Sequence, residues 1–389
     1  MGLFAAHAAA RRGWDVTVLE QGRVGESLLS WGSTRFFSPL DMNLPEGLRE
    51  ALPGLPPPEA LLTGPEMVER VLLPLSRSPL LYDRVRLRHR VASIGRAGLT
   101  RRDLPGHPVR HEKPFRLAVE GPEGEYLMDA DLVMDATGVY GQPAWAGPGG
   151  LPAPGERAAG GRILRRLGDL EAYAAALTEG RVLLLGHGHS AAHALLALGE
   201  TARRSSRVSV TWAFRSRNLR PLKETPSDPL PERARVVSAA NALAAVPPGW
   251  LEVRRNASLA SFAQSGVISR PGESLGVALS TASGAPGSAE SKLYQACDAV
   301  AAFTGYRPDN TIHSELALDL SPATEGSRRL QAALAGATDC LSVPKVSAAD
   351  LESGEPGFHL IGARSYGRSG AFLLRDGIRH VEMILDHAA

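Results

Sequence analysis

The feature that most constrains this fold is an apolar strand that leads through a glycine turn into an alanine-rich helix. Arg181 to Leu185 (RVLLL) has the composition of a buried strand, and Ala191 to Glu200 is rich in Ala and Leu. The turn between them has the spacing G-x-G-x-x-A and begins at Gly186. A second apolar strand, Val208 to Phe214, follows the helix. This order predicts a complete βαβ unit with parallel strands.

A turn of this kind suits the pyrophosphate of a dinucleotide. Gly186 permits the tight turn, Gly188 lets the phosphates approach the backbone, and Ala191 lets helix and strand pack closely. The free N–H groups and the positive end of the helix dipole would bind the phosphates. We therefore expect a dinucleotide site at this turn. The alternative is a tight strand-to-helix turn in a different Rossmann-like fold.

The end of the next strand selects the nucleotide. NAD sites place an acidic residue there for the ribose 2′-hydroxyl, whereas this strand continues as Phe214-Arg215-Ser216-Arg217. Arg215 and Arg217 could hold a 2′-phosphate through charge-assisted hydrogen bonds. The sequence therefore favours NADPH over NADH. The alternative for each arginine is a solvated charge in a loop.

The N-terminal segment resembles the second half of another βαβ unit. Leu3 to Arg12 has good helix propensity, Gly13 ends the helix, and Asp15 to Glu20 is predicted to be a buried strand. Glu20 lies about 18 residues after Gly2, near the offset expected between a phosphate turn and a ribose-binding carboxylate. Gly2 would be the third glycine of a turn whose first two glycines are absent. The alternative is a surface Glu at a strand end.

Strands and helices alternate along the rest of the chain, which favours an α/β fold with parallel sheets. A Pro- and Gly-rich stretch at 141–160 is the best linker candidate, and residues 218–249 are Pro-rich with one helical stretch. Further strands are expected at Val85 to Arg96, Phe115 to Glu120, Tyr126 to Met128, Asp131 to Asp135, Asp298 to Thr304 and Phe358 to Ile361. Further helices are expected at Gly64 to Ser76 and at about Ala371 to Leu385.

Composition excludes several classes of protein. Of the 389 residues, 43% are hydrophobic and 22% are charged, which is the balance of a globular chain. Lys and Arg number 43 against 41 Asp and Glu, so a net charge of +2 leaves no basic surplus for nucleic acid. Two Cys exclude a disulfide scaffold and a multi-Cys zinc site. Without a signal-peptide pattern or a long apolar run for a membrane span, we expect a cytoplasmic enzyme.

Four segments, taken in order, resemble the two-dinucleotide-binding-domain flavoproteins. This superfamily includes flavin-containing monooxygenases, N-hydroxylating monooxygenases and thioredoxin-reductase-like enzymes. The segments are MGLFAAHAAARRGWDVTVLEQG, MDATGVYGQP, VLLLGHGHSAAHALLALGE, and AFTGYRPD followed by FHLIGARSYGRSGAFLLRDGIRHVEMIL. The resemblance spans nearly the whole chain. It implies two Rossmann-like domains, with an NADPH domain at 146–294 inserted into an FAD domain made of 1–145 and 295–389.

The resemblance implies which residues hold FAD. Gly2 and Glu20 would hold the pyrophosphate and the adenosine ribose, with Gln21 beside them. The backbone of Val91 would contact the adenine, and Gly362 would meet the ribityl and phosphate groups. The C-terminal helix would direct its N-terminus at the flavin ring and so stabilise the anionic reduced flavin.

The resemblance also assigns residues between the domains and at the NADPH turn. Thr137 and Gly138 match the A-T-G segment that crosses between the domains near the flavin. The residues that match the NADPH turn are Gly186, Gly188, Ser190 and Ala191.

Two further segments are candidates for the pocket itself. Residues 31–39 lie where family members carry a loop against the flavin, so Trp31, Arg35 and Phe36 could line the flavin and nicotinamide site. Ordinary loop packing is the alternative. The residues after the late strand that could face a substrate are Ser365, Tyr366 and Arg368.

The chain departs from two subfamilies. A disulfide reductase needs a C-x-x-C pair, but Cys297 and Cys340 are far apart in sequence, and Cys297 is expected to be a small core residue. The F-x-G-x-x-x-H-type fingerprint of flavin-containing and Baeyer–Villiger monooxygenases is also absent. His187, His189 and His193 have a spacing that suggests a metal, but these side chains would surround a pyrophosphate, so no metal is expected.

These features predict an FAD-dependent NADPH oxidoreductase with monooxygenase-like chemistry on a small molecule, with molecular oxygen as co-substrate. Hydride transfer from NADPH to FAD needs no protein acid or base, so no catalytic residue is predicted. The alternatives are a flavin-dependent reductase of another acceptor and a non-enzymatic nucleotide-binding or redox-sensing module. Residues 218–285 carry no readable substrate signature, and the resemblance alone suggests a homodimer.

The beginning of the sequence leaves two hypotheses open. The first strand and the first two glycines of the FAD unit are absent before Met1. Met1 is then either an internal residue of a longer protein, within a G-x-G-x-M-G-type run, or the start of a truncated FAD unit with weakened FAD binding.

Overall fold

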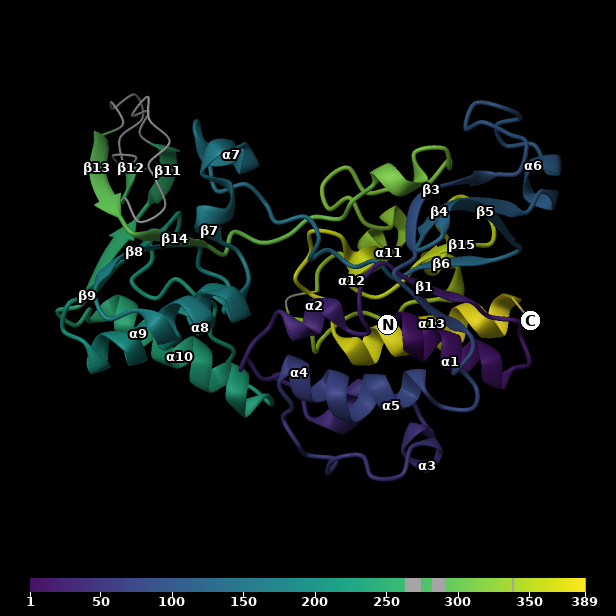
Figure 1. Ribbon diagram of the computed structural model, residues 1–389, viewed down its shortest axis with the longest axis horizontal. Coiled ribbons are helices and arrows are strands. Elements are labelled where there is room, and N and C mark those ends of the chain that lie inside the picture. The colour runs from purple at the N-terminus through teal and green to yellow at the C-terminus, as the bar shows by residue number, and fades with distance from the viewer. Residues whose placement is uncertain (263–273, 282–290, 338, 389) are drawn as a thin grey trace.

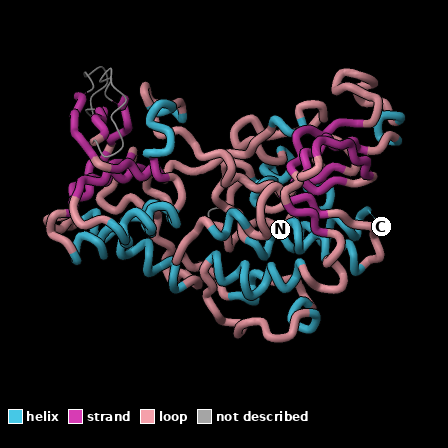
Figure 2. Tube along the Cα trace, in the orientation of Figure 1, coloured by secondary structure: helices cyan, strands magenta, loops and turns pink. Residues whose placement is uncertain are grey.

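Two lobes joined by two extended connections make up the computed structural model (Figure 1). The structure describes residues 1–262, 274–281, 291–337 and 339–388. The first connection follows β6 (Val133–Asp135) and the second follows β14 (Ala299–Ala302). Helices gather below the strands in both lobes (Figure 2). Both lobes contain parallel strand pairs, so the α/β prediction is confirmed.

The second lobe is built on a parallel sheet with the strand order β10-β9-β8-β14-β7. Three helices cover one face of this sheet, and an antiparallel sheet with the order β11-β12-β13 covers the other. The strands of the parallel sheet besides β14 are β7 (Ile163–Leu164), β8 (Gly180–Leu185), β9 (Val208–Phe214) and β10 (Leu251–Arg255). The covering elements are α8 (Leu167–Ala176), α9 (His189–Arg204), α10 (Pro231–Ala245), β11 (Ala257–Phe262), β12 (Leu275–Thr281) and β13 (Ser291–Cys297).

Short elements precede this sheet. They are η3 (Pro148–Gly150), α7 (Glu156–Ala159) and η4 (Gly160–Arg162). The buried side chains of β8 alternate between the two faces, with Leu184 against the helices and Leu183 and Leu185 against the second sheet. A strand covered on both faces is apolar throughout, which is why the run VLLL was recognisable in the sequence.

The first lobe contains two separate parallel pairs, β1 (Val18–Glu20) with β2 (Val85–Leu87) and β6 with β15 (Phe358–Leu360). An antiparallel sheet has the order β3 (Arg90–Arg96), β4 (Phe115–Gly121), β5 (Gly124–Ala130). The helices are α1 (Gly2–Arg11), α2 (Glu26–Leu29), η1 (Leu40–Asn43), α3 (Leu48–Ala51), α4 (Gly64–Met67), η2 (Val68–Leu72), α5 (Leu73–Ser76), α6 (Val109–Glu112), η5 (Thr311–His313), α11 (Arg328–Ala333), η6 (Ala348–Leu351), α12 (Ala363–Tyr366) and α13 (Leu374–Ala388).

Helix α1 lies at the centre of the first lobe. It packs along α13 and also contacts β1 and β6, so it lies between the two parallel pairs. Ala5, Ala8 and Ala9 are buried on its face toward α13, where small side chains allow a close approach. The α-amino group of Met1 is buried as well, and loss of solvation lowers its pKa to about 6.

Most predicted elements are present. The helix predicted over Gly64 to Ser76 is formed by α4, η2 and α5 in succession, and Thr63 and Glu66 make a capping box at its start. The strand predicted at Val85 to Arg96 is divided into β2 and β3, because Arg88 adopts a positive φ of 61° between them. The strands β7, β10, β11, β12 and β13 and the helix α8 were not predicted.

The second boundary between the lobes lies later than residues 294 and 295. Strand β14 pairs with β8 and β7 in the sheet of the second lobe, although the predicted boundary assigned it to the other domain. The chain therefore returns to the first lobe after Ala302. No helix in the described part of the chain is long and apolar enough to cross a membrane.

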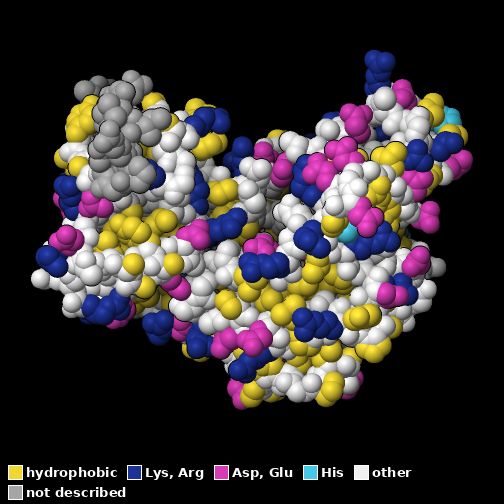
Figure 3. Space-filling model, in the orientation of Figure 1, with side chains coloured by type: hydrophobic (Ala, Val, Ile, Leu, Met, Phe, Trp, Pro, Cys, Tyr) yellow, Lys and Arg dark blue, Asp and Glu magenta, His cyan; other side chains and the backbone are white. Residues whose placement is uncertain are grey.

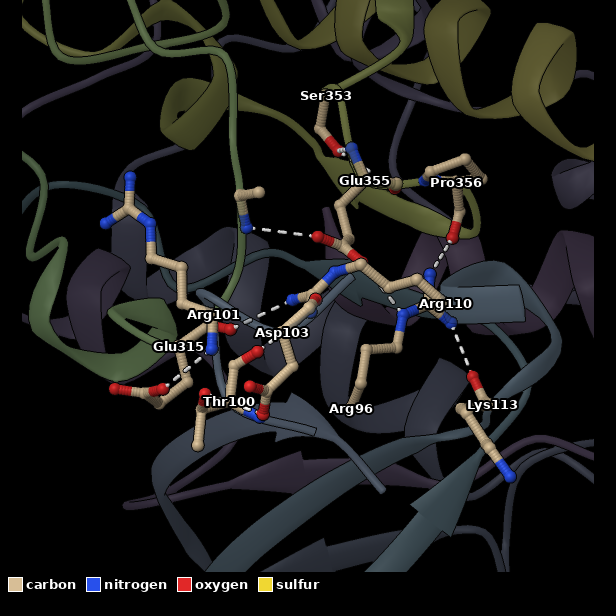
Figure 4. Close-up of polar contacts among 11 residues, drawn as sticks. Arg96, Thr100, Arg101, Asp103, Arg110, Lys113, Glu315, Ser353, Glu355 and Pro356 are labelled. Atoms are coloured by element: carbon tan, nitrogen blue, oxygen red, sulfur yellow. Dashed lines mark hydrogen bonds and ion pairs between the residues drawn. The ribbon is translucent and has the colours of Figure 1, made fainter. Parts of the chain in front are cut away.

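A buried cluster of charged side chains holds the segment that connects β3 to β4 (Figure 4). Arg96 Nε donates to Glu355 Oε1 at 2.9 Å, and both side chains are almost wholly buried. Arg110 lies 3.3 Å from the same carboxylate and donates to the backbone carbonyls of Thr100 and Asp103. Such a pair tolerates burial because further hydrogen bonds occupy the groups that water would have solvated.

The packing of α9 yields a stability prediction. Leu195→Ala removes a fully buried side chain from the interface of α9 with the sheet, whereas its neighbour Leu196 is only partly buried. We expect Leu195→Ala to lower the free energy of unfolding by about 2–5 kcal/mol, because it leaves a cavity. Urea unfolding followed by circular dichroism measures this loss. A loss for Leu196→Ala equal to that for Leu195→Ala would contradict the packing described.

Candidate functional site

The glycine turn after β8 is held between two neighbouring strands. Gly186 has a φ of 108°, and a Cβ on it would lie 2.2 Å from the carbonyl oxygen of Phe303 at the end of β14. The indole Nε1 of Trp212 donates to Gly186 O at 2.7 Å, and Gly186 N donates to Ala213 O at 3.2 Å. Only glycine fits this position, because the conformation and the close approach both exclude a side chain.

The next residues of the turn face open space. Gly188 is exposed and caps α9, and no atom lies within 4 Å of the position that its Cβ would take. Ser190 is half-buried in the first turn of α9, and Ala191 is fully buried in the core against the sheet. The predicted members of this turn are therefore together at the carboxyl ends of β8 and β14, where parallel sheets bind ligands.

A cavity of about 470 Å³ adjoins the turn. Its lining includes His187, Gly188, Lys223 and Arg233 of the second lobe and Asp339 of the first. The outline of the molecule is notched between the two lobes (Figure 3). A dinucleotide bound at the turn would therefore lie at the junction of the lobes.

Arg233 connects the lobes at this cavity. Its guanidinium donates to Asp228 at 2.7 and 2.8 Å, to Asp339 at 3.0 Å and to the Sγ of Cys340 at 3.1 Å. The hydrogen bond from Arg233 is the main reason that the pKa of Asp228 lies below its usual value. The carboxylates in the cavity are thus already paired, which leaves it without an uncompensated negative charge.

The two candidate phosphate-binding arginines lie beyond β9 and both are exposed. The pKa of His187 is lowered first by burial and then by the positive charge of Arg215, so that guanidinium lies near the turn. Arg217 is further along the same loop. Of the two, Arg215 is the better placed for a group bound at Gly188.

The residues predicted for the adenosine end of FAD lie at the end of β1 and at the start of β3. The N–H of His89 donates to the carbonyl of Glu20 at 3.0 Å, so the segment that leads into β3 runs beside the end of β1. Val91 lies in β3, two residues after His89, and Gln21 is exposed next to Glu20. The Glu20 carboxylate is partly buried, which raises its pKa, and it accepts a hydrogen bond from Gly22 N at 2.8 Å.

Aromatic side chains line the two connections. The ring centroid of Trp31 lies 4.8 Å from that of Phe36 and 6.2 Å from that of Tyr140, and the Tyr140 ring lies 4.6 Å from that of Tyr306. Burial, and then Tyr306, raises the pKa of Tyr140 far above its usual value. Arg35 is directed elsewhere, because it donates to Leu61 O at 2.6 Å.

Thr137 and Gly138 begin the first connection, as the resemblance implies. Thr137 is exposed, and Gly138 has a φ of 71° with no atom within 4 Å of a Cβ.

Gly2 and Gly362 are brought together by Met1. A Cβ on Gly362 would lie 2.5 Å from Met1 Cγ, so the Met1 side chain fills the approach to this glycine. The Met1 side chain therefore occupies the space in which the contact implied for Gly362 would lie. Ser365 is also not directed at a pocket, because it is buried and donates to Gly362 O at 2.8 Å. Arg368 pairs with Glu325 at 2.6 Å.

A buried polar group that was not predicted lies beneath the first connection. Asp135 accepts hydrogen bonds from Thr137 and from Arg364, and Arg364 also donates to His313. All three side chains that accompany Thr137 are buried. A charged residue at the end of each apolar strand, in MDATG and in LIGAR, was the available signal.

The loop after Trp31 contacts the second lobe directly. Phe37 stacks on His193 with ring centroids 5.5 Å apart and meets the edge of His189 at 5.2 Å. Ser33 donates to Glu171 of α8 from its N–H at 2.7 Å and from its hydroxyl at 2.8 Å. The predicted flavin loop therefore reaches both helices that begin near the dinucleotide turn.

The stacked His193 makes the stability of this contact dependent on pH. Burial is the main cause that lowers the pKa of His193 from 6.5 to about 4. Between these two pH values the unfolded chain binds a proton at His193 and the folded protein does not. Stability therefore falls as the pH drops from about 6.5 to about 4, by about 3 kcal/mol at most. His193→Phe keeps the stacking and should flatten this loss in urea unfolding measured across that range. An unchanged slope would contradict the assignment.

No protein-family model and no curated protein sequence matches this chain. Solved structures match it over nearly its whole length. A bacillithiol disulfide reductase from Bacillus cereus is 17% identical with a TM-score of 0.69, and the match covers 99% of this chain and 94% of that one. A cadaverine monooxygenase from Erwinia amylovora, bound to FAD, is 13% identical with a TM-score of 0.64 and coverage of 99% and 92%.

A third solved structure adds a nicotinamide cofactor. An ornithine N-hydroxylase from Kutzneria sp. 744, with reduced FAD, NADP⁺ and L-ornithine, is 14% identical with a TM-score of 0.61 and coverage of 99% and 96%. These likenesses concern the fold. The chain has the two-lobed α/β fold of thioredoxin-reductase-like enzymes and flavin-dependent N-hydroxylating monooxygenases, which the four sequence segments implied.

Proposed function

We propose that the chain is an FAD-dependent NADPH oxidoreductase. The observation that carries the proposal is the open turn at Gly188, at the start of α9 and at the edge of the sheet where the chain returns to the first lobe. When bound, NADPH would supply a hydride and FAD would accept it. A fold shared with structures that hold FAD and NADP⁺ supports the pairing of these two cofactors.

The chain's own residues would bind and orient the two cofactors. The N–H groups at the start of α9 would hold the NADPH pyrophosphate, and Arg215 would hold the 2′-phosphate. Glu20 would accept hydrogen bonds from the adenosine ribose of FAD, with the backbone near Val91 at the adenine. The aromatic group of Trp31, Tyr140 and Tyr306 would exclude water from the junction of the lobes.

We further propose that the protein, once its FAD has been reduced, acts on oxygen and a small molecule, as in a monooxygenase. Disulfide reduction is less well supported, because the two thiols are separate. Cys297 is buried in the second lobe, and burial raises its pKa to about 12, whereas Cys340 lies beside Arg233. A thiol with such a raised pKa is a poor nucleophile. Two unpaired thiols also suit a reducing compartment, which supports a cytoplasmic location.

The proposed function is tested by absorption spectroscopy. We expect the purified chain to retain added FAD through gel filtration, and its band at about 450 nm to bleach on anaerobic addition of NADPH. Oxygen uptake and hydrogen peroxide yield, measured with and without candidate amines, then separate a monooxygenase from a reductase of another acceptor. If FAD is retained but NADPH does not bleach it, the chain is not an NADPH oxidoreductase.

The choice of nucleotide is tested at β9. Arg215→Gln should raise the dissociation constant for NADPH about tenfold, because it removes a charge-assisted hydrogen bond to the 2′-phosphate, and should leave NADH binding unchanged. Fluorescence titration of both nucleotides measures this difference. Arg217→Gln is the matched control, and we expect a smaller effect from it. Equal losses for NADPH and NADH in Arg215→Gln would contradict the assignment.

A further inference from the structure

A fully buried ion pair lies directly beneath the first connection. Arg364 Nε donates to Asp135 Oδ2 at 2.9 Å, and neither side chain is more than 1% exposed. Asp135 ends β6, and Arg364 lies in α12, just after β15. Parallel pairing of β6 with β15 brings these two strand ends side by side, with Leu360 opposite Asp135.

The carboxylate of this pair holds the beginning of the first connection. Asp135 Oδ1 accepts hydrogen bonds from both Thr137 N at 2.9 Å and Thr137 Oγ1 at 2.7 Å. The two bonds fix the backbone of Thr137 immediately before Gly138, which adopts a positive φ of 71°. The direction in which the chain leaves the first lobe is therefore set by the Asp135 side chain.

The guanidinium of the pair holds the end of the second connection. Arg364 Nη2 donates to Asn310 Oδ1 at 2.5 Å and to His313 Nε2 at 2.5 Å, and it approaches Asp309 O at 3.4 Å. The pKa of His313 is lowered to about 4, first by burial and then by Arg364, so its Nε2 is a neutral acceptor. The remaining nitrogen, Arg364 Nη1, is buried without a hydrogen-bond partner among the described residues.

We infer that the Asp135–Arg364 ion pair is a positioning element for the flavin, because it holds both connections between the lobes. It reaches the first connection at Thr137 and the second connection at Asp309 to His313. The inference rests on the proposed function, since it takes the Thr137–Gly138 backbone to border the flavin. The pair touches no reacting atom and acts through the backbone it holds.

The cluster in Figure 4 supplies a matched control for this test. Arg96 and Glu355 also form a buried pair, with the same Nε–O distance of 2.9 Å and at most 2% exposure. The hydrogen bonds of Arg96 reach Glu355, Lys113 and Pro356, none of which belongs to a connection between the lobes. Breaking either pair should destabilise the first lobe, but only one of them should affect a flavin.

The experiment compares four variants of the full chain. FAD affinity is measured by quenching of flavin fluorescence, the visible circular dichroism of bound FAD reports its surroundings, and thermal unfolding is measured without FAD. We expect Asp135→Asn and Arg364→Lys to weaken FAD binding about tenfold and to change the dichroism spectrum. We expect Glu355→Gln and Arg96→Lys to lower the melting temperature comparably while FAD affinity stays within about twofold.

A second pair of variants covers the case in which a buried substitution prevents folding. Thr137→Val removes one hydrogen bond to Asp135 from an exposed residue, and Thr137→Ser keeps it. We expect Thr137→Val to weaken FAD binding and Thr137→Ser to restore it. The inference is overturned if Asp135→Asn, Arg364→Lys and Thr137→Val all bind FAD as tightly as the control variants. If the unmodified chain retains no FAD, the proposed function and this inference both fail. If it retains FAD and these variants bind it as tightly as the controls, this inference alone fails.

Discussion

Both connections between the two lobes are anchored by a buried contact between opposite charges. Asp135 and Arg364 are 229 residues apart in sequence, and a charge buried alone at either position would be very costly. The pair is tolerated because Thr137 and His313 occupy hydrogen-bonding positions that water would otherwise fill. The same bonds fasten both connections to the first lobe, so the requirement to satisfy a buried charge also determines where the chain crosses to its second lobe.

In the second lobe, close backbone packing, and not a charged pair, holds the turn beside the second connection. Gly186 lies so close to the carbonyl of Phe303 that a side chain cannot fit, and Trp212 closes the turn from the neighbouring strand. The turn is therefore rigid while Gly188 beside it is open. A rigid, unobstructed helix N-terminus is the geometry that a pyrophosphate requires. The loop that carries Trp31 and Phe37 then covers the junction, so the first lobe contributes to the surroundings of the second lobe's turn.

The parts of this structure that the sequence predicted well are governed by local rules. Strand β9 has the predicted bounds of Val208 to Phe214, because most of its side chains are apolar and are buried against one face of the sheet or the other. The helix from Gly64 to Ser76 was predicted, and its start is marked locally by Pro65 in the first turn. The antiparallel strands β11 to β13 were missed, because their pairing partners are distant and their alternation is weak. The position of the second lobe boundary was misjudged for the same reason, since only pairing with β8 assigns β14 to a sheet.

The sequence by itself determined the strand–turn–helix unit of the second lobe, the helix–strand segment at the N-terminus, the spacing of the dinucleotide turn, and the order of the four segments that imply a two-lobed flavoprotein fold. These features are encoded within about 20 to 30 residues each, where propensity and turn chemistry act. Tertiary structure alone decided that Met1 fills the approach to Gly362, that Arg35 turns toward Leu61, and that Asp135 meets Arg364. Such contacts join residues far apart in the chain, and only the packing of β6 beside β15 brings the last pair within hydrogen-bond distance.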